Sequence, residues 1–151
     1  MRINKPRRLF PALAAAVATV TVPAGMAIAS QFRAVMSGEN LTPRGDPDGW
    51  GRARVRVDDT MNLVCVDLEV RSLGQATEAH IHRGGEGVTG MPVVNLDVPG
   101  PNGDDDAEDC DDVGDALADE IQANPGAFYA DVHTADHPEG ALRGQLAPSE
   151  G

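Results

Sequence analysis

Two stretches of alternating side chains decide the fold of this chain: Arg52-Ala53-Arg54-Val55-Arg56-Val57 and Leu63-Val64-Cys65-Val66-Asp67-Leu68-Glu69-Val70-Arg71. In both stretches, apolar residues alternate with residues that are mostly charged. Because successive side chains of a strand point to opposite faces of a sheet, this period of two predicts two half-buried β-strands. Between them, Asp58-Asp59-Thr60 predicts a tight turn.

Other segments of the chain show the same alternation over shorter lengths. They predict strands over residues 32–36, 78–82, 92–98, 128–133 and 141–146. One helix is predicted over residues 115–123, because Leu117 and Ile121 lie four positions apart on one helix face and Asn124-Pro125-Gly126 ends it. Short strands separated by turns, with one short helix near 115–123, predict an all-β protein built as an antiparallel Greek-key β-sandwich.

Residues 1–29 have the pattern of an export signal. Four basic residues stand in the first eight positions, an apolar stretch covers residues 9–22, and Ala27-Ile28-Ala29 matches the A-x-A cleavage pattern. The apolar stretch is interrupted by prolines and threonines, and it is shorter than the roughly 20 apolar residues of a membrane-spanning helix. Arg7-Arg8-Leu9-Phe10 resembles the twin-arginine signature, so both export routes stay open. We expect residues 1–29 to be removed and residues 30–151 to form one secreted or extracytoplasmic domain without a membrane span.

The charge of the chain comes almost entirely from acidic residues after the predicted signal. The 151 residues carry a net charge of −12, from 12 Lys and Arg against 24 Asp and Glu. Removing residues 1–29 removes four of the basic residues and none of the acidic ones, so residues 30–151 carry −16 and no lysine. Phosphate groups are bound by clustered basic residues, so this composition argues against anionic lipids and excludes nucleic acid as a partner.

The predicted export gives the two cysteines a meaning. Cys65 lies in a predicted strand and Cys110 in an acidic segment, 45 positions further along the chain. In an oxidising compartment, an isolated pair of cysteines most simply forms a disulfide. The alternative is a pair of free thiols.

Residues 99–112 are expected to form an acidic loop. Seven carboxylates fall within residues 104–112, and clustered carboxylate oxygens suit a calcium ion. The spacing does not match the EF-hand pattern, because no glycine stands at the turn position and no glutamate closes the loop. We therefore favour a solvated loop whose charges repel one another and whose end is anchored by Cys110.

All four histidines of the chain lie in two short segments. His80 and His82 are two positions apart and therefore point to one face of a strand, while His133 shares a strand face with Asp131. If the two strands are neighbours, three or four imidazoles converge, as copper and zinc ions require. The candidate metal ligands are His80, His82, His133 and His137, with Asp131 as a further ligand or as a residue that orients one. The alternative is that these histidines only fix turns through hydrogen bonds.

Enzymatic motifs do not single out a catalytic residue. No serine of the chain stands in the G-x-S-x-G context of a nucleophile elbow. The glycine-rich segment Gly84-Gly85-Glu86-Gly87 has no lysine and no predicted helix after it, so a nucleotide cofactor is not predicted. A non-enzymatic role is therefore favoured.

Three blocks of the sequence form a recognisable pattern: Phe32-Arg33-Ala34-Val35-Met36-Ser37-Gly38-Glu39-Asn40, then Ala79-His80-Ile81-His82-Arg83-Gly84, then the block from Tyr129 to Leu146 with Val132-His133-Thr134, His137-Pro138 and Arg143-Gly144-Gln145. These blocks resemble the CHRD domain family, named after the repeats of chordin. The resemblance covers about residues 31–147. It implies an extracellular β-sandwich domain without an established enzymatic activity. Asp131 departs from the family pattern, in which Asn is commoner.

The strand segment His80-Ile81-His82 is also similar to the copper-binding strand of Cu/Zn superoxide dismutases. The sandwich is therefore expected to be immunoglobulin-like or Cu/Zn superoxide dismutase-like. The resemblance and the residues together predict a secreted, non-enzymatic CHRD domain that acts as an extracellular binding or structural module, with an unknown extracellular partner. The alternative is a copper- or zinc-binding protein that uses the histidine cluster, with superoxide dismutase-like redox chemistry as its strongest form.

Overall fold

The computed structural model describes residues 29–100 and 105–149, so the predicted export signal lies outside the described residues apart from Ala29. In chain order, the strands are β1 (Ser30–Ser37), β2 (Trp50–Asp58), β3 (Leu63–Arg71), β4 (Ala76–Arg83), β5 (Pro92–Leu96), β6 (Asp105–Asp112), β7 (Phe128–Thr134), β8 (Leu142–Gln145) and β9 (Ala147–Pro148). The helices are α1 (Asp115–Ala123) and two short 3-10 helices, η1 (Gly38–Asn40) and η2 (Pro125–Ala127). The predicted all-β fold is confirmed.

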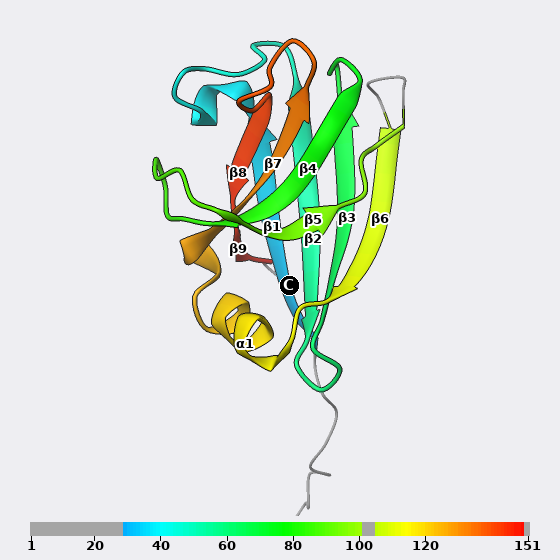
Figure 1. The fold of residues 1–151 in the computed structure, drawn as a ribbon, viewed down its shortest axis with the longest axis vertical. Helices are drawn as coiled ribbons and strands as arrows, with labels where there is room; N and C mark the ends of the chain where they lie inside the picture. The colour runs from blue at the N-terminus through cyan, green and yellow to red at the C-terminus, as the bar shows by residue number, and fades with distance from the viewer. Residues whose placement is uncertain (1–28, 101–104, 150–151) are drawn as a thin grey trace, which may run out of the picture.

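Hydrogen bonds connect the strands into one antiparallel order, β5-β4-β7-β8-β1-β2-β3-β6, and β9 pairs with β1. The sheet bends back on itself, so that β5, β4, β7 and β8 form one layer across from β1, β2, β3 and β6 (Figure 1). The result is a β-sandwich that is nearly closed into a barrel. The connections from β3 to β4, from β5 to β6 and from β6 to β7 cross between the layers, as in a Greek-key arrangement.

The two alternating stretches that predict the fold form β2 and β3, which pair along their whole length. Val55 lies opposite Val66, and each is only 1% exposed. The outward face of the same pair carries charges, with Arg56 and Asp67 in an ion pair at 2.6 Å. Each fully buried valine contributes about 1.5–3 kcal/mol relative to an exposed one, so the inward face stabilises the sandwich and the outward face keeps it soluble.

The helix α1 has the predicted bounds and lies at one end of the sandwich (Figure 1). Ala118 and Ile121 are fully buried, whereas Leu117 is only partly buried. The buried face is therefore turned slightly from the one that Leu117 and Ile121 predict. The guanidinium of Arg83, at the end of β4, donates from Nε to Oε1 of Glu120 at 2.9 Å, so an ion pair fastens the helix to the layer that contains the histidines.

The acidic segment differs from the loop expected over residues 99–112, because residues 105–112 form the edge strand β6 beside β3. The predicted disulfide is confirmed: Cys65 and Cys110 lie opposite each other in this pairing and are bonded. Asp and Glu are depleted in strands, so their own preference does not explain β6. The strand forms because β3 offers a row of backbone partners and the disulfide holds it there.

Strand geometry divides the carboxylates of β6 between the two faces of the sheet. On the outer face, Glu108 pairs with Arg56 at 3.1 Å. On the other face, Oδ2 of Asp109 accepts a hydrogen bond from the backbone nitrogen of Asp97 at 3.2 Å, which links β6 to the chain leaving β5. An acidic strand with charges on both faces also discourages another chain from pairing with this edge.

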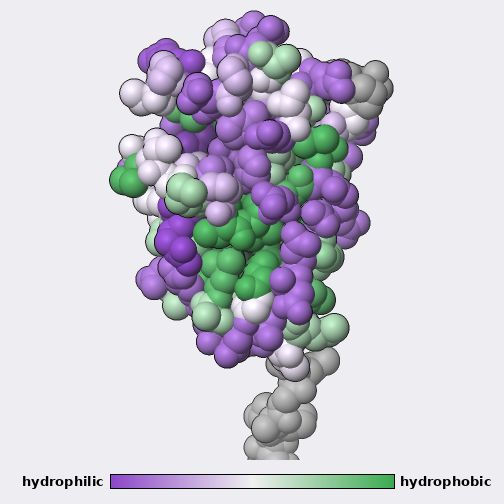
Figure 2. Space-filling view, viewed as in Figure 1, coloured by the Kyte–Doolittle hydropathy of each residue, from purple (hydrophilic) through white to green (hydrophobic). Residues whose placement is uncertain are grey.

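Apolar side chains reach the surface on one side of the sandwich. Figure 2 shows an apolar area between β5, β6 and α1, framed by hydrophilic residues. The partly buried hydrophobic residues that pack against the core are Val93, Leu96, Val113, Leu117 and Ala127. Within the described ranges, the structure contains no helix with the length and apolar character needed to cross a membrane.

Candidate metal centre

The two histidine segments are neighbours in the structure, because β4 pairs with β7. In this antiparallel register His80 lies opposite Asp131, and Glu78 lies opposite His133. Ala79 and Ile81, which alternate with the histidines of β4, are 2% and 0% exposed and face the core. The predicted alternation is therefore correct, and it places the imidazoles on the outer face of the layer.

Four side chains converge on this face: His80, His82, Asp131 and His133. Their candidate ligand atoms all lie within 4.8 Å of one another. The carboxylate of Asp131 is at the centre, with Nε2 of both His82 and His133 3.1 Å from its Oδ2, and Nδ1 of His80 3.4 Å from its Oδ1. His137 is not part of this group. It belongs to the turn after β7, where its backbone nitrogen donates to Oγ1 of Thr134 at 3.2 Å.

Backbone carbonyls fix the orientation of two of the rings. Nδ1 of His82 lies 2.9 Å from the carbonyl oxygen of Gly90, and Nδ1 of His133 lies 2.9 Å from that of Pro138. A carbonyl oxygen only accepts, so each Nδ1 carries the proton. In the neutral ring, Nε2 then presents a lone pair toward Asp131. Two lone pairs facing a carboxylate are stable only with a positive charge between them, supplied by a proton or by a metal ion.

The charges of the cluster shift in the direction that this geometry requires. Burial opposes the ionisation of Asp131, but its contacts with His133 and His82 outweigh burial and lower its pKa to about 2. The bond to Asp131 raises the pKa of His133 to about 9, against the effect of burial. Burial lowers the pKa of His82, yet the contacts with Asp131 and the Gly90 carbonyl raise it overall. Asp131 therefore stays charged and attracts cations.

Several polar atoms of the cluster are buried but poorly aligned. Nδ1 of His80, Nε2 of His82 and Oδ1 of Asp131 have no hydrogen bond of good geometry within the described residues. The 3.1 Å contact between His82 and Asp131 is close in distance but not directed along a hydrogen-bond axis. Buried polar atoms without partners are costly, and atoms that surround a common point without pointing at one another suit ligands of a shared ion.

The model of the CHRD domain family matches residues 32–146, which include both histidine segments. The chain belongs to the CHRD domain family. A search of curated proteins finds no match. In this CHRD domain the central sequence block forms most of β4 and the closing block spans β7 and β8, so all four residues of the histidine cluster lie within these two blocks.

A layered stack of side chains adjoins the cluster in this CHRD domain. The ring of Tyr129 lies parallel to the ring of His82, with 4.8 Å between the centroids and 11° between the planes. The guanidinium of Arg143 lies 3.5 Å from the Tyr129 centroid on β7. The hydrogen bonds of Arg143 go to the carbonyl oxygens of Gly85 and Val88, at 2.8 and 3.0 Å.

Sequence reasoning missed the role of the glycine-rich loop, residues 84–91, that joins β4 to β5. Residues 85–90 have the G-x-G-x-x-G spacing, but the loop connects two antiparallel strands and lacks the following helix whose N-terminus would bind a pyrophosphate. Its carbonyls instead hold His82 and Arg143. The sequence feature that could have indicated this contact is Gly90, which lies eight positions after His82 near the end of the glycine-rich loop.

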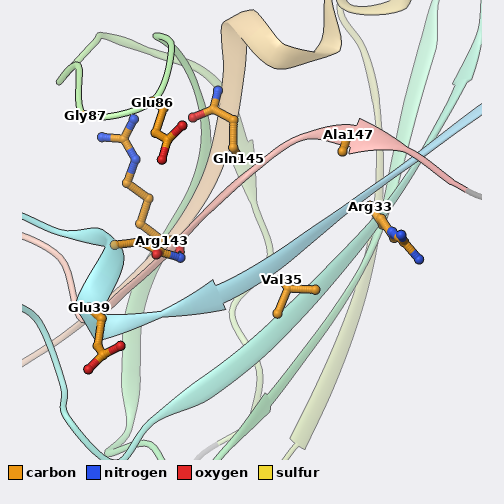
Figure 3. A pocket seen from close by; sticks show the side chains of 9 residues that line it. Arg33, Val35, Glu39, Glu86, Gly87, Arg143, Gln145 and Ala147 are labelled. Atoms are coloured by element: carbon orange, nitrogen blue, oxygen red, sulfur yellow. The ribbon is translucent and has the colours of Figure 1, made fainter.

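A pocket of about 540 Å³ lies beside the stack and is separate from the histidine cluster. Figure 3 shows Arg143 and Gln145 extending toward Glu86 and Gly87 of the loop, with Val35 on the neighbouring strand. Arginine and glutamate side chains both line this pocket, so its charge does not select one class of ligand.

Proposed function

We propose that this CHRD-domain protein is exported and acts outside the cytoplasm as a metal-binding module. It holds one Cu²⁺ or Zn²⁺ ion through His80, His82, His133 and Asp131. The observation that carries the proposal is the convergence of three imidazole nitrogens and one carboxylate within 4.8 Å on the outer face of β4 and β7. Metal binding is the alternative that the sequence left open beside a module with an unknown partner, and no enzymatic step is part of the proposal.

The donor set favours these two ions. Imidazole nitrogens suit copper and zinc, whereas calcium and magnesium take oxygen ligands. Tetrahedral zinc holds nitrogens at about 2.0–2.1 Å, which places ligand atoms about 3.3 Å apart. The donors are now within 4.8 Å of one another, so side-chain movements of about 1 Å suffice to bring them to a common ion.

The surroundings of the ligands also favour a metal. Histidines that bind metals usually donate their other ring N–H to a carbonyl or carboxylate, which sets the tautomer. His82 and His133 have this arrangement, through the carbonyls of Gly90 and Pro138. Export is supported by the disulfide, because disulfides persist in oxidising compartments, and by the extracellular character typical of CHRD domains.

Metal titration tests the proposal. The protein recovered from the exported fraction is stripped with a chelator, dialysed and titrated with Cu²⁺ and with Zn²⁺, beside the variant His80→Ala/His82→Ala. We expect at least one ion to bind with a Kd below about 10 µM, and the double variant to lose at least about 100-fold of that affinity. His137→Ala is the matched control and should bind as the unchanged protein does.

Two results would overturn the metal proposal: no binding of either ion below about 10 µM, or equal loss of affinity in the control and in the double variant. Export has its own measurement, because mass spectrometry of the exported protein should give a first residue of Ser30. A chain that keeps residues 1–29 and stays in the cytoplasm would contradict export.

A further inference from the structure

The loop of residues 84–91 supplies the backbone carbonyl that binds Nδ1 of His82, one of the proposed metal ligands. It leaves β4 directly after Arg83 and returns beside it, with the Arg83 nitrogen 3.1 Å from the carbonyl oxygen of Met91. The adjacent carbonyl, that of Gly90, accepts from Nδ1 of His82. Four of the eight loop residues are glycines, which gives the backbone wide conformational freedom. The loop can therefore fix the orientation of His82 only if other contacts hold the loop itself in place.

Arg143 makes the main contacts that hold the loop in place. Its guanidinium bonds two loop carbonyls, those of Gly85 and Val88, and the side chain is buried, with 6% of the residue exposed. Figure 3 shows it reaching from its strand toward the loop. Gln145, two residues further along β8, donates to the carbonyl of Gly84 at 2.9 Å. Hydrogen bonds from a charged donor are about twice as strong as neutral ones, so Arg143 dominates this set.

Arg143 also acts on the ring of His82 indirectly, through the ring of Tyr129. Arg143 lies over one face of Tyr129, and His82 lies over the tyrosine ring. The hydroxyl oxygen of Tyr129 accepts from the Gly90 nitrogen at 3.2 Å, so the tyrosine contacts both the ring and the residue that binds its Nδ1. Cation–π and stacking contacts of this kind fix ring orientation.

We infer that Arg143 is a positioning residue of the metal centre, which holds His82 through the 84–91 loop and the ring of Tyr129 so that Nε2 faces Asp131. The inference rests on the proposed metal function. It explains why Arg143 pairs with carbonyls: a carboxylate partner would fix the arginine but would leave the loop free. An ammonium group is a poor replacement, because it lacks the planar face with which the guanidinium stacks on Tyr129.

The first test compares Arg143→Lys with Arg44→Lys, whose parent side chain is exposed and pairs only loosely with Glu39 at 3.7 Å. Titration with Cu²⁺ should give a Kd about 10–100-fold weaker for Arg143→Lys and an unchanged Kd for Arg44→Lys. The electron paramagnetic resonance spectrum of bound Cu²⁺ should change in Arg143→Lys, while the circular dichroism spectrum of both variants stays that of the unchanged protein. An unchanged Kd and spectrum in Arg143→Lys would overturn the inference.

A second variant and a second measurement keep the question separate from folding and from metal binding. Tyr129→Phe keeps the stacked ring and loses only the hydrogen bond to Gly90, so its loss of Cu²⁺ affinity should be smaller than that of Arg143→Lys. If Arg143→Lys does not fold, an unchanged affinity and Cu²⁺ spectrum in Tyr129→Phe counts against the inference.

If the unchanged protein binds no Cu²⁺, the proposed function fails, and the orientation of His82 is then measured in the metal-free protein by nuclear magnetic resonance. The Nδ1 proton of His82 should exchange slowly in the unchanged protein and faster in either variant, and equal exchange would overturn the inference.

Discussion

Nε2 of His133 lies 3.1 Å from Oδ2 of Asp131, two residues earlier on the same strand. The pair is formed within β7 because side chains two positions apart share a face, and its contact with His82 on β4 extends it across two strands. In the metal-free protein this is an ion pair, since the pKa of Asp131 is lowered and that of His133 is raised.

The metal-free protein should lose stability as the pH rises. The pKa of His133 moves from 6.5 to about 9 on folding, so its contribution is complete below pH 6.5 and is lost as the pH rises through about 9. Asp131 acts at the other end: its contribution is present above pH 3.8 and is lost as the pH falls through about 2. Thermal melts in the presence of a chelator should therefore be highest between about pH 4 and 6.5.

The variant Asp131→Asn is the control for this pH dependence. Without the carboxylate, the pKa of His133 has no large upward shift, so the melting temperature should change little between pH 6.5 and 9. A metal-free protein whose melting temperature is constant over that range would contradict the proposed ion pair.

Reduction of the disulfide should release the acidic edge strand in a salt-dependent way. Six of the eight residues of β6 are acidic, and within the described residues the ion pairs that join their side chains to arginines are Arg56–Glu108 and Arg71–Asp106. A cross-link over 45 residues stabilises by roughly 4 kcal/mol. In 1 M NaCl the Debye length falls to about 3 Å and the repulsion is screened.

Hydrogen exchange of residues 105–112 measures this release. In low salt, these amides should exchange faster after reduction, or in Cys65→Ser/Cys110→Ser, while amides of β2 stay protected. In 1 M NaCl much of the protection should return. Equal exchange in the oxidised and reduced protein at low salt would show that β3 alone holds β6.

Gly90→Ala should disturb both the loop and the metal centre, whereas Gly85→Ala should be tolerated. A Cβ atom on Gly90 would lie 1.5 Å from the carbonyl oxygen of Arg83, so the backbone must separate there. A Cβ atom on Gly85 meets nothing within 4 Å. We expect a loss of about 2 kcal/mol or more in the free energy of unfolding for Gly90→Ala, together with weaker Cu²⁺ binding, and little change for Gly85→Ala. Similar stability of the two variants in urea denaturation would contradict the close approach at Gly90.

Ile121→Ala and Leu117→Ala should differ in their effect on stability. Ile121 is fully buried where α1 meets the sandwich, and Leu117 is only partly buried. Truncating a fully buried isoleucine costs about 2–5 kcal/mol, and the leucine substitution should cost less than half as much. The comparison by urea denaturation checks which face of α1 carries the packing, and an equal cost would favour the face predicted from sequence spacing alone.

Much of this fold could be read from the sequence because it depends on short-range rules. The alternation in β2 and β3 reports which side chains are buried, and it needs no knowledge of partners. The bounds of α1 follow from its apolar spacing and from Asn124-Pro125-Gly126. The partnership of Cys65 and Cys110 could be predicted because the chain has no other cysteine.

The sequence could indicate most members of the histidine cluster but not its geometry. Period-two spacing places His80 and His82 on one face, but only the β4–β7 register puts Asp131 opposite His80. His137 is only four positions after His133 in the sequence. It nevertheless lies in the turn that follows Thr134 and is not part of the cluster.

The sequence by itself determined most of the strands, the short helix and the two groups of histidines, because these depend on neighbours a few residues apart. The tertiary structure alone decided that the acidic segment becomes a strand and that Arg143 pairs with carbonyls. The first outcome depends on a bond to Cys65, 45 positions away, and the second on a loop 55 to 58 positions away. No local propensity encodes contacts at that separation, because they exist only after segments far apart in the sequence have come together in the folded sheet.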